Sequence, residues 1–176
     1  MNLNQKIIDT ACDAAFTGKE IYPWDSGPVV AELQGLLRAH GYTIRIIDGD
    51  FGSLTEAAVR SFQKKHSLRI NGVVGPQTWA ALKSTVKPGT RVLRLGYSGN
   101  DVYELQGLLQ VNGYEINRTG IFDQKTKLAI KDFQLKHKLK DNGIVNSITW
   151  TVLRGGYPQP TPSKEPFWLS NFLKWR

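Results

Sequence analysis

The hexapeptide Glu-Leu-Gln-Gly-Leu-Leu occurs twice in this chain of 176 residues, at 32–37 and at 104–109. The likeness extends outward from it, because residues 26–44 align with 98–116 at an offset of 72. One residue is then lost, and the alignment continues at an offset of 71, so that 27 of about 56 aligned positions are identical. A repeat of this length indicates that a whole folding unit has been duplicated, and it predicts two small consecutive domains.

The first part of each unit predicts a helix that ends at a glycine. In the first copy Val30, Leu33 and Leu37 lie three and four residues apart, which places them on one face of a helix. Ser26 precedes this run and is expected to act as its N-cap, as Ser98 is in the second copy. The glycine of the following Gly-Tyr pair supplies the helix stop.

Two further helices are expected in each unit. In the first copy one begins near Thr55 and buries Phe62, and a short third helix carries Trp79 and Leu82 into the core. Asp-Gly and Asn-Gly turn signals separate the helices and leave room for short extended pieces only. The sequence therefore predicts an all-α fold class, with two consecutive small three-helix-bundle modules, an N-terminal helix and a Pro-rich C-terminal tail.

Composition shifts divide the chain into five parts. Pro88-Gly89 marks a bend between the copies, and the tail "YPQPTPSKEP" is typical of a polyproline-II spacer. The tail ends in "FWLSNFLKWR", for which packing on a module, the start of a further domain, a partner protein and a membrane surface are alternatives. The expected parts are an N-terminal helix and lead-in at 1–25, module 1 at 26–83, a linker at 84–97, module 2 at 98–154, and the Pro-rich tail with a short apolar segment at 155–176.

Charge and composition narrow the class of partner. The formal net charge is +8 with a pI near 9.6, which favours polyanionic partners such as nucleic acid, an anionic membrane or a cell wall. The single cysteine, Cys12, cannot form an internal disulfide. No apolar run is long enough to cross a membrane, and Asp9 and Asp13 interrupt any apolar core of a classical export signal.

The ordered motifs of the first copy then point to a family. The stretch "DGDFGSLTEAAVRSFQKKHSLRINGVVGPQTW" at 48–79, which follows "ELQGLLRAHGY" at 32–42, resembles the bacterial peptidoglycan-binding domain of the three-helix type. That family occurs as a non-catalytic module on cell-wall hydrolases, spore-cortex enzymes and phage endolysins. The resemblance implies that this chain binds peptidoglycan, either its glycan strand or its peptide stems.

The second copy departs from this pattern in its loops. Asp48 has no clear counterpart there, Gly52 becomes Asp123, and Gly75-Pro76 becomes Asn146-Ser147. The fold is expected to survive, because asparagine is a good helix cap. We therefore expect the two copies to bind unequally.

No catalytic constellation is visible, so we expect a protein that is not an enzyme and has no metal and no cofactor. His66 and His137 occupy equivalent positions of two modules, where capping or packing is expected of them. Glu32 and Glu104 are expected on solvated helix faces rather than as a glycosidase pair. Cys12 has no histidine motif beside it.

A peptidoglycan site needs aromatic faces for sugars, amide or hydroxyl partners, and cations for the carboxylates of the peptide stems. We expect such a groove at the loop between the first two helices and along the second helix of each copy. The candidate ligand-binding residues are Tyr42, Arg45, Asp48, Asp50, Arg60, Gln63, Tyr114, Arg118, Lys131 and Gln134.

Three functions remain open at this point. The first is non-catalytic anchoring to peptidoglycan by both modules, and the second is the targeting part of a wall hydrolase or endolysin whose catalytic domain is absent here. The third is a protein–protein interaction module. Separately, a catalytic domain or partner protein is a possible contact of the C-terminal tail. No nucleic-acid motif is visible. The expected location is the cell wall or envelope, reached without a visible signal peptide, as a phage-encoded or leaderless protein would require.

Overall fold

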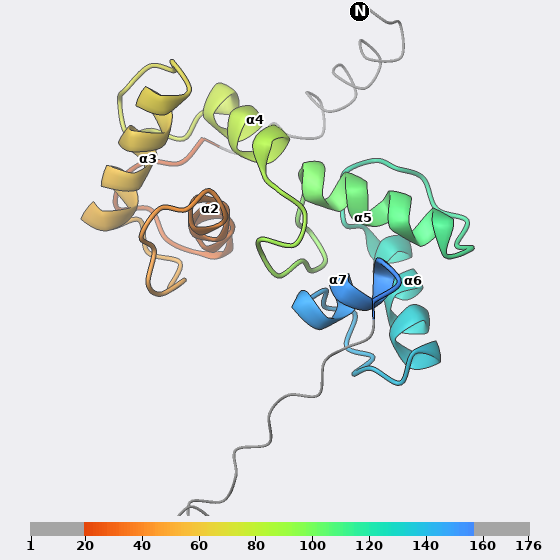
Figure 1. Cartoon of the computed structure of the whole chain (residues 1–176). Coiled ribbons are helices and arrows are strands. Elements are labelled where there is room, and N and C mark those ends of the chain that lie inside the picture. The colour runs from red at the N-terminus through yellow and green to blue at the C-terminus, as the bar shows by residue number, and fades with distance from the viewer. Residues whose placement is uncertain (1–19, 157–176) are drawn as a thin grey trace, which may run out of the picture.

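The computed structural model describes residues 20–156 and forms two bundles of three helices, one after the other along the chain (Figure 1). The first bundle contains α2 (Pro28–Ala39), α3 (Ser53–Lys65) and α4 (Pro76–Thr85), and the second α5 (Asn100–Val111), α6 (Gln124–Lys136) and α7 (Ser147–Leu153). No strand longer than an isolated bridge occurs in this described part, which confirms the all-α prediction. The predicted N-terminal helix and Pro-rich tail lie outside the described residues.

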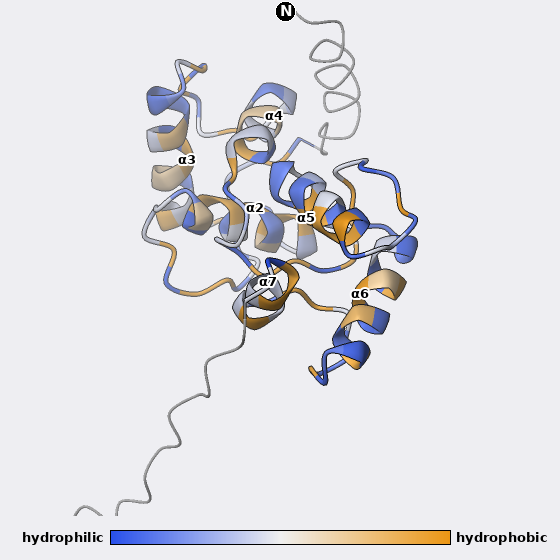
Figure 2. Ribbon diagram, turned by 45° about the vertical axis from the view of Figure 1, so that its right-hand side comes forward, coloured by the Kyte–Doolittle hydropathy of each residue, from blue (hydrophilic) through white to orange (hydrophobic). Residues whose placement is uncertain are grey.

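Each bundle has its own hydrophobic core, built from the periodic positions of its helices. Leu33, Phe62 and Trp79 are buried in the first core, and their equivalents are buried in the second. The apolar sides of the helices alternate with hydrophilic sides, as an amphipathic pattern requires (Figure 2). The expectation that both repeated tryptophans belong to the cores is confirmed.

A short lead-in segment completes each bundle. Ile21 pairs with Val74, and Ser26 pairs with Asp50, so residues 21–26 lie against both loops of module 1. The equivalent pairs in module 2 are Leu93 with Val145 and Ser98 with Ile121. Ile21 and Leu93 are themselves core residues, although position 93 falls in the stretch expected to be a linker.

The predicted N-caps Ser26 and Ser98 are wrong. The residues in the cap positions of α2 and α5 are Gly27 and Gly99, and neither makes a side-chain cap. Their backbones have positive φ angles of 119° and 148°, which glycine adopts readily, and each N–H donates to a glycine carbonyl in the following loop. The serines one residue earlier are used instead for pairing with that loop.

Helix caps in module 2 follow the expectation for asparagine. Asn146 accepts a hydrogen bond from the backbone N–H of Thr149 at 3.0 Å, and Asp123 accepts one from Thr126 at 2.7 Å. The substitutions that set the second copy apart are therefore compatible with its helices, because each replaces a glycine cap with a side-chain cap.

A buried glutamine on the first and second helix of each module holds the loop that follows it. In module 1 Gln34 accepts from the N–H of Gly49 at 2.9 Å and donates to the carbonyl of Asp50 at 3.0 Å. Its amide also lies 3.3 Å from the hydroxyl of Thr55 on α3. The four clamps are Gln34–Gly49–Thr55, Gln63–Gly72–Thr78, Gln106–Gly120–Thr126 and Gln134–Gly143–Thr149.

These clamps reveal a second level of repetition inside each module. The clamped glycine and threonine recur 23 residues later in the same module, and all four glycines have positive φ angles between 70° and 81°. Each module is thus two related helix–loop units, and its two loops have the same backbone design. A left-handed glycine is needed there because the clamped N–H must turn toward the glutamine.

Candidate functional site

The loop between α2 and α3 lines a groove of about 340 Å³ in module 1. It brings together Arg45, Asp48 and Asp50, three of the residues predicted to bind ligand. All three are exposed, and Arg45 forms no hydrogen bond or ion pair with the described residues. The remaining lining residues are Gln34, Thr43, Ile44, Ile46, Gly52, Ser53, Leu54 and Thr55.

Asp48 is already partly engaged by the protein. Its Oδ1 accepts from the Gln34 amide at 2.7 Å and from the backbone N–H of Asp50 at 3.0 Å. The backbone hydrogen bond from Asp50, followed by the one from Gln34, holds the pKa of the Asp48 carboxyl below its usual value. Asp48 therefore shapes the loop, while Arg45 and Asp50 are the charged groups of this groove that have no internal partner.

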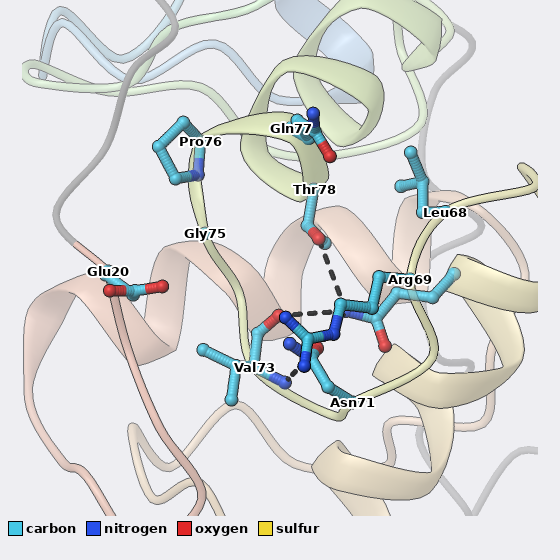
Figure 3. A pocket seen from close by; sticks show the side chains of 10 residues that line it. Glu20, Leu68, Arg69, Asn71, Val73, Gly75, Pro76, Gln77 and Thr78 are labelled. Atoms are coloured by element: carbon cyan, nitrogen blue, oxygen red, sulfur yellow. Dashed lines mark hydrogen bonds between the residues drawn. The ribbon is translucent and has the colours of Figure 1, made fainter.

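A second groove of about 370 Å³ lies at the loop between α3 and α4, and it corresponds to the first by the repetition inside the module. There the amide of Gln63 donates to the Asn71 side chain, the Val73 backbone carbonyl and the Thr78 hydroxyl. Figure 3 shows Asn71, Val73 and Thr78 gathered on one side of this groove. Glu20, Leu68, Arg69, Gly75, Pro76 and Gln77 complete the lining. The groove contains charged groups of both signs, Glu20 and Arg69, but no aromatic ring.

Two predicted ligand-binding glutamines have structural duties. Gln63 and Gln134 are each 1% exposed, and their amides clamp the loops at Gly72 and Gly143. A side chain that is buried and hydrogen-bonded at both amide atoms has little left to offer a ligand. Gln63 and Gln134 are therefore structural residues and not ligand-binding candidates.

The two predicted tyrosines cover the edges of the cores. Tyr42 and Tyr114 are half-buried and meet the rings of Phe62 and Phe133 edge-on at 6.2 and 6.4 Å. Tyr114 also donates to Asp132 at 2.8 Å. Burial, together with this bond, raises the pKa of the Tyr114 hydroxyl. Each tyrosine leaves part of its ring on the surface.

The structure separates the predicted cations from one another. Arg60 pairs with Glu56 on α3 at 2.8 Å, on the side of the second groove. Arg118 lies 4.0 Å over the ring of Tyr103 and pairs with Glu104 at 3.1 Å. Lys131 is exposed on α6. The single groove expected in each copy is thus divided in module 1 between two loops, with Arg45, Asp48 and Asp50 at one and Arg60 and Gln63 at the other.

The sequence reasoning missed Trp24 and Tyr22, which lie in the lead-in segment between the two grooves. Trp24 is 80% exposed, and its backbone N–H donates to the carbonyl of Phe51 at 2.8 Å. Tyr22 is half exposed and donates through its hydroxyl to Glu20. Extending the repeat alignment five residues toward the N-terminus would have exposed the anomaly, because Trp24 then stands opposite Gly96.

A third hollow of about 280 Å³ lies where the two modules meet. Arg38, Arg91 and Arg94 line it, and Tyr97 lies 5.0 Å from each of the last two guanidinium groups. Arg91 is almost fully buried, and its Nη1 has no hydrogen-bond partner among the described residues. Arg91 pairs with Asp101 at 2.7 Å, so Arg38 and Arg94 supply the positive charge of this hollow that has no paired carboxylate among the described residues.

Residues 20–156 contain neither a metal-type cluster nor a membrane-spanning helix. No group of three or more His, Cys, Asp or Glu side chains in that range is arranged to hold a metal ion. No helix there combines the length and the apolar character that crossing a membrane demands.

Comparison with known proteins assigns both bundles to one family. The family model described as "Putative peptidoglycan binding domain" matches residues 26–82 and 98–153. A spore cortex-lytic enzyme of Bacillus cereus is 35% identical over an alignment that covers 58% of this chain and 44% of that protein. The N-acetylmuramoyl-L-alanine amidase CwlL of Bacillus licheniformis is 28% identical, with 82% of this chain and 48% of the relative covered.

Among solved structures, an endolysin of the Burkholderia phage AP3 is 36% identical. The alignment covers 39% of this chain and 26% of the endolysin, with a TM-score of 0.38. The chain spans about half the length of the curated relatives that it matches.

Proposed function

The chain belongs to the peptidoglycan-binding domain family, and from this membership we propose that it binds bacterial cell-wall peptidoglycan without catalysing its cleavage. The observation that carries the proposal is the tandem match, which takes in both bundles. The protein then acts at the cell wall or envelope, where it anchors or targets any domain or protein to which it is joined.

We place the main contact at the α2–α3 loop groove of module 1. Peptide stems carry free carboxylates, for which the guanidinium of Arg45 is a charged hydrogen-bond donor. Sugar hydroxyls and acetamido N–H groups find an acceptor in the carboxylate of Asp50. Tyr42 and Arg60 lie outside this groove and are secondary candidates, as are Tyr114, Arg118 and Lys131 of module 2.

Module 2 is proposed to bind more weakly at the equivalent loop. Thr119 takes the place of Asp48 beside Gln106, the glutamine equivalent to Gln34. Its hydroxyl accepts from the Gln106 amide, and its backbone N–H donates to the Gln106 side-chain oxygen. Ile121 takes the place of Asp50, so the loop loses both carboxylates. The nearby cation Arg118 is held by Glu104 and the ring of Tyr103.

Co-sedimentation with purified, insoluble peptidoglycan tests the proposal. The full chain is expected in the pellet at low salt, and its absence from the pellet would reject wall binding. The double variant Arg45→Gln/Asp50→Asn removes one charge of each sign from the groove and is expected to weaken pelleting by about tenfold. The matched control Lys64→Gln/Asp141→Asn removes the same charges from exposed positions elsewhere and should pellet like the unmodified chain.

The relatives favour a second, compatible function. They are wall-lytic enzymes about twice as long as the aligned part of this chain, so we propose that these modules can serve as the targeting part of such a hydrolase. Fusing residues 1–176 to a wall hydrolase that has lost its own binding modules tests this. Restored lysis of intact walls supports the targeting function, and unchanged lysis rejects it.

A further inference from the structure

Trp24 has a backbone conformation that a tryptophan rarely adopts. Its φ angle is +78°, in the left-handed region where a side chain with a β-carbon is strained. Only two other described non-glycine residues, Ser67 and Lys138, share this feature, and both follow the ends of helices. Trp24 is thus a large, strained residue in a turn.

The second module shows what the turn itself requires. The equivalent residue is Gly96, with a φ of +89°, and its N–H donates to the carbonyl of Phe122 at 2.9 Å. Trp24 makes the same backbone bond to Phe51 at 2.8 Å. Any residue except proline can supply that bond, and glycine supplies it without strain. The fold therefore does not explain the indole.

Packing does not explain the indole either. The side chain of Trp24 is 80% exposed, whereas Trp79 and Trp150 are buried in the cores. Within residues 20–156 the indole of Trp24 makes no ring contact, ion pair or hydrogen bond. A strained residue that is exposed and unneeded by the fold is the pattern that strain at functional sites produces.

The position of Trp24 indicates the kind of ligand that its indole can bind. Its segment pairs at one end with Val74, beside the second groove, and at the other with Phe51, beside the first. Both grooves contain polar and aliphatic side chains but no aromatic ring, and the segment that pairs with both loops carries the exposed indole of Trp24. A chain of pyranose rings can use both kinds of surface, because each ring carries apolar C–H faces and polar groups around its edge.

We propose that Trp24 is a stacking platform for a sugar ring of the glycan strand, so that module 1 recognises the glycan and not the peptide stems alone. The inference rests on the proposed function and adds the part of the polymer that is bound. Module 2, with Gly96 in this place, has no such platform.

The decisive variant is Trp24→Gly, because it installs the residue that module 2 uses at the same place. Backbone strain is relieved, so the melting temperature of the full chain is expected to stay unchanged or rise. Affinity for purified peptidoglycan is expected to fall by about tenfold, and Trp24→Tyr, which keeps an aromatic face, should retain most of it. Leu95→Ala is the control, since it trims an exposed apolar residue from the equivalent segment of module 2.

A soluble probe separates this inference from wall binding in general. N-acetylglucosamine tetramer carries acetylated sugar rings and no peptide. In an NMR titration of the full chain, the indole N–H signal that is missing from Trp24→Gly is expected to shift, while those of the buried Trp79 and Trp150 stay in place.

Each outcome decides the proposal. A lower melting temperature for Trp24→Gly would show that the indole packs on another part of the chain and would overturn the platform. Full wall affinity of that variant would also overturn it, while leaving the proposed function intact. If the unmodified chain does not bind walls, a tetramer-induced shift of the Trp24 signal still supports sugar stacking, and its absence rejects it.

Discussion

Lys83, on the last helix of module 1, donates a 2.9 Å hydrogen bond to the hydroxyl of Ser98, directly before the first helix of module 2. The same ammonium group lies 3.3 Å from Glu32 on α2 and 4.8 Å from the ring of Trp79. The Lys83 and Glu32 side chains are only 7% and 13% exposed. Glu32 is therefore not on a solvated helix face, as the sequence suggested, but in a buried charge pair where the modules meet.

Removing the cation should loosen the modules from each other. Lys83→Met keeps the apolar length of the side chain but leaves the Glu32 carboxylate buried without its partner. We expect a loss of about 3 kcal/mol in the free energy of unfolding, because breaking one half of a buried pair is costly. Chemical denaturation of the full chain measures it. Lys83→Met/Glu32→Gln should recover part of the loss, and a single variant as stable as the unmodified chain would contradict a role for the pair.

Arg91 and Asp101 form a second buried pair at this junction, with distances of 2.7 and 3.1 Å. Module 1 has the exposed Val29 in the position of Asp101, so it has no carboxylate at the equivalent place. Asp101→Asn should lower the free energy of unfolding by about 3 kcal/mol, because it leaves the buried charge of Arg91 without its counter-ion. One nitrogen of that guanidinium, Nη1, already has no hydrogen-bond partner among the described residues. A calorimetric scan is expected to show one transition for the unmodified chain and two separate transitions for the variant. One shared transition at the original temperature would count against this coupling.

The sequence predicted the helices and cores well, because both depend on a spacing of apolar residues that a single chain displays. Leu33, Phe62 and Trp79 are recognisable as core by periodicity alone. Glu32 and Ser98 were misjudged because their partners come from another helix or another module, and pattern along the chain carries no such information. Trp24 was missed for a different reason, since the alignment of the two copies began at residue 26 and did not reach the position where Trp24 stands opposite Gly96.

The candidate site was predicted only in part for a related reason. Arg45, Asp48 and Asp50 lie close together in the sequence, and the loop keeps them in one groove. Gln63 looks like a surface amide in the sequence, and its burial follows from a glycine nine residues further along that needs a hydrogen-bond acceptor. The repeated Gln, Gly and Thr of each half-module were the available signal, because an internal clamp requires those three residues at each loop.

The glutamine clamps should matter for stability and not for binding alone. Gln63→Leu leaves the Gly72 N–H and the Val73 carbonyl, both held by this amide, without their partner. We expect a destabilisation of about 3 kcal/mol, because unsatisfied buried polar groups each cost about 1–3 kcal/mol. Amide hydrogen exchange at Gly72 should also become faster. Gln77→Leu alters an exposed glutamine of the same groove and should change neither quantity.

His40 makes the stability of module 1 depend on pH. Its Nε2 donates to the carbonyl of Leu82 at 2.9 Å, and its ring lies 5.1 Å from that of Phe62. Burial lowers the pKa of His40 below its usual value, and the nearby charges of His66, Lys65 and Arg91 act in the same direction, against the raising effect of the Leu82 carbonyl. The folded state therefore binds a proton less readily than the unfolded state, in which histidine titrates near pH 6.5.

The contribution of neutral His40 to the free energy of unfolding is consequently complete above about pH 6.5. It is lost as the pH falls through the lower pKa that His40 has in the folded state. Module 2 supplies a matched replacement, because Asn112 occupies the equivalent position and donates to the carbonyl of Leu153 at 3.3 Å. His40→Asn should keep the bond to Leu82 and remove this part of the pH dependence. Urea denaturation between pH 5 and pH 8 tests the prediction. An unchanged slope of stability against pH in His40→Asn would contradict the assignment of this pH dependence to His40.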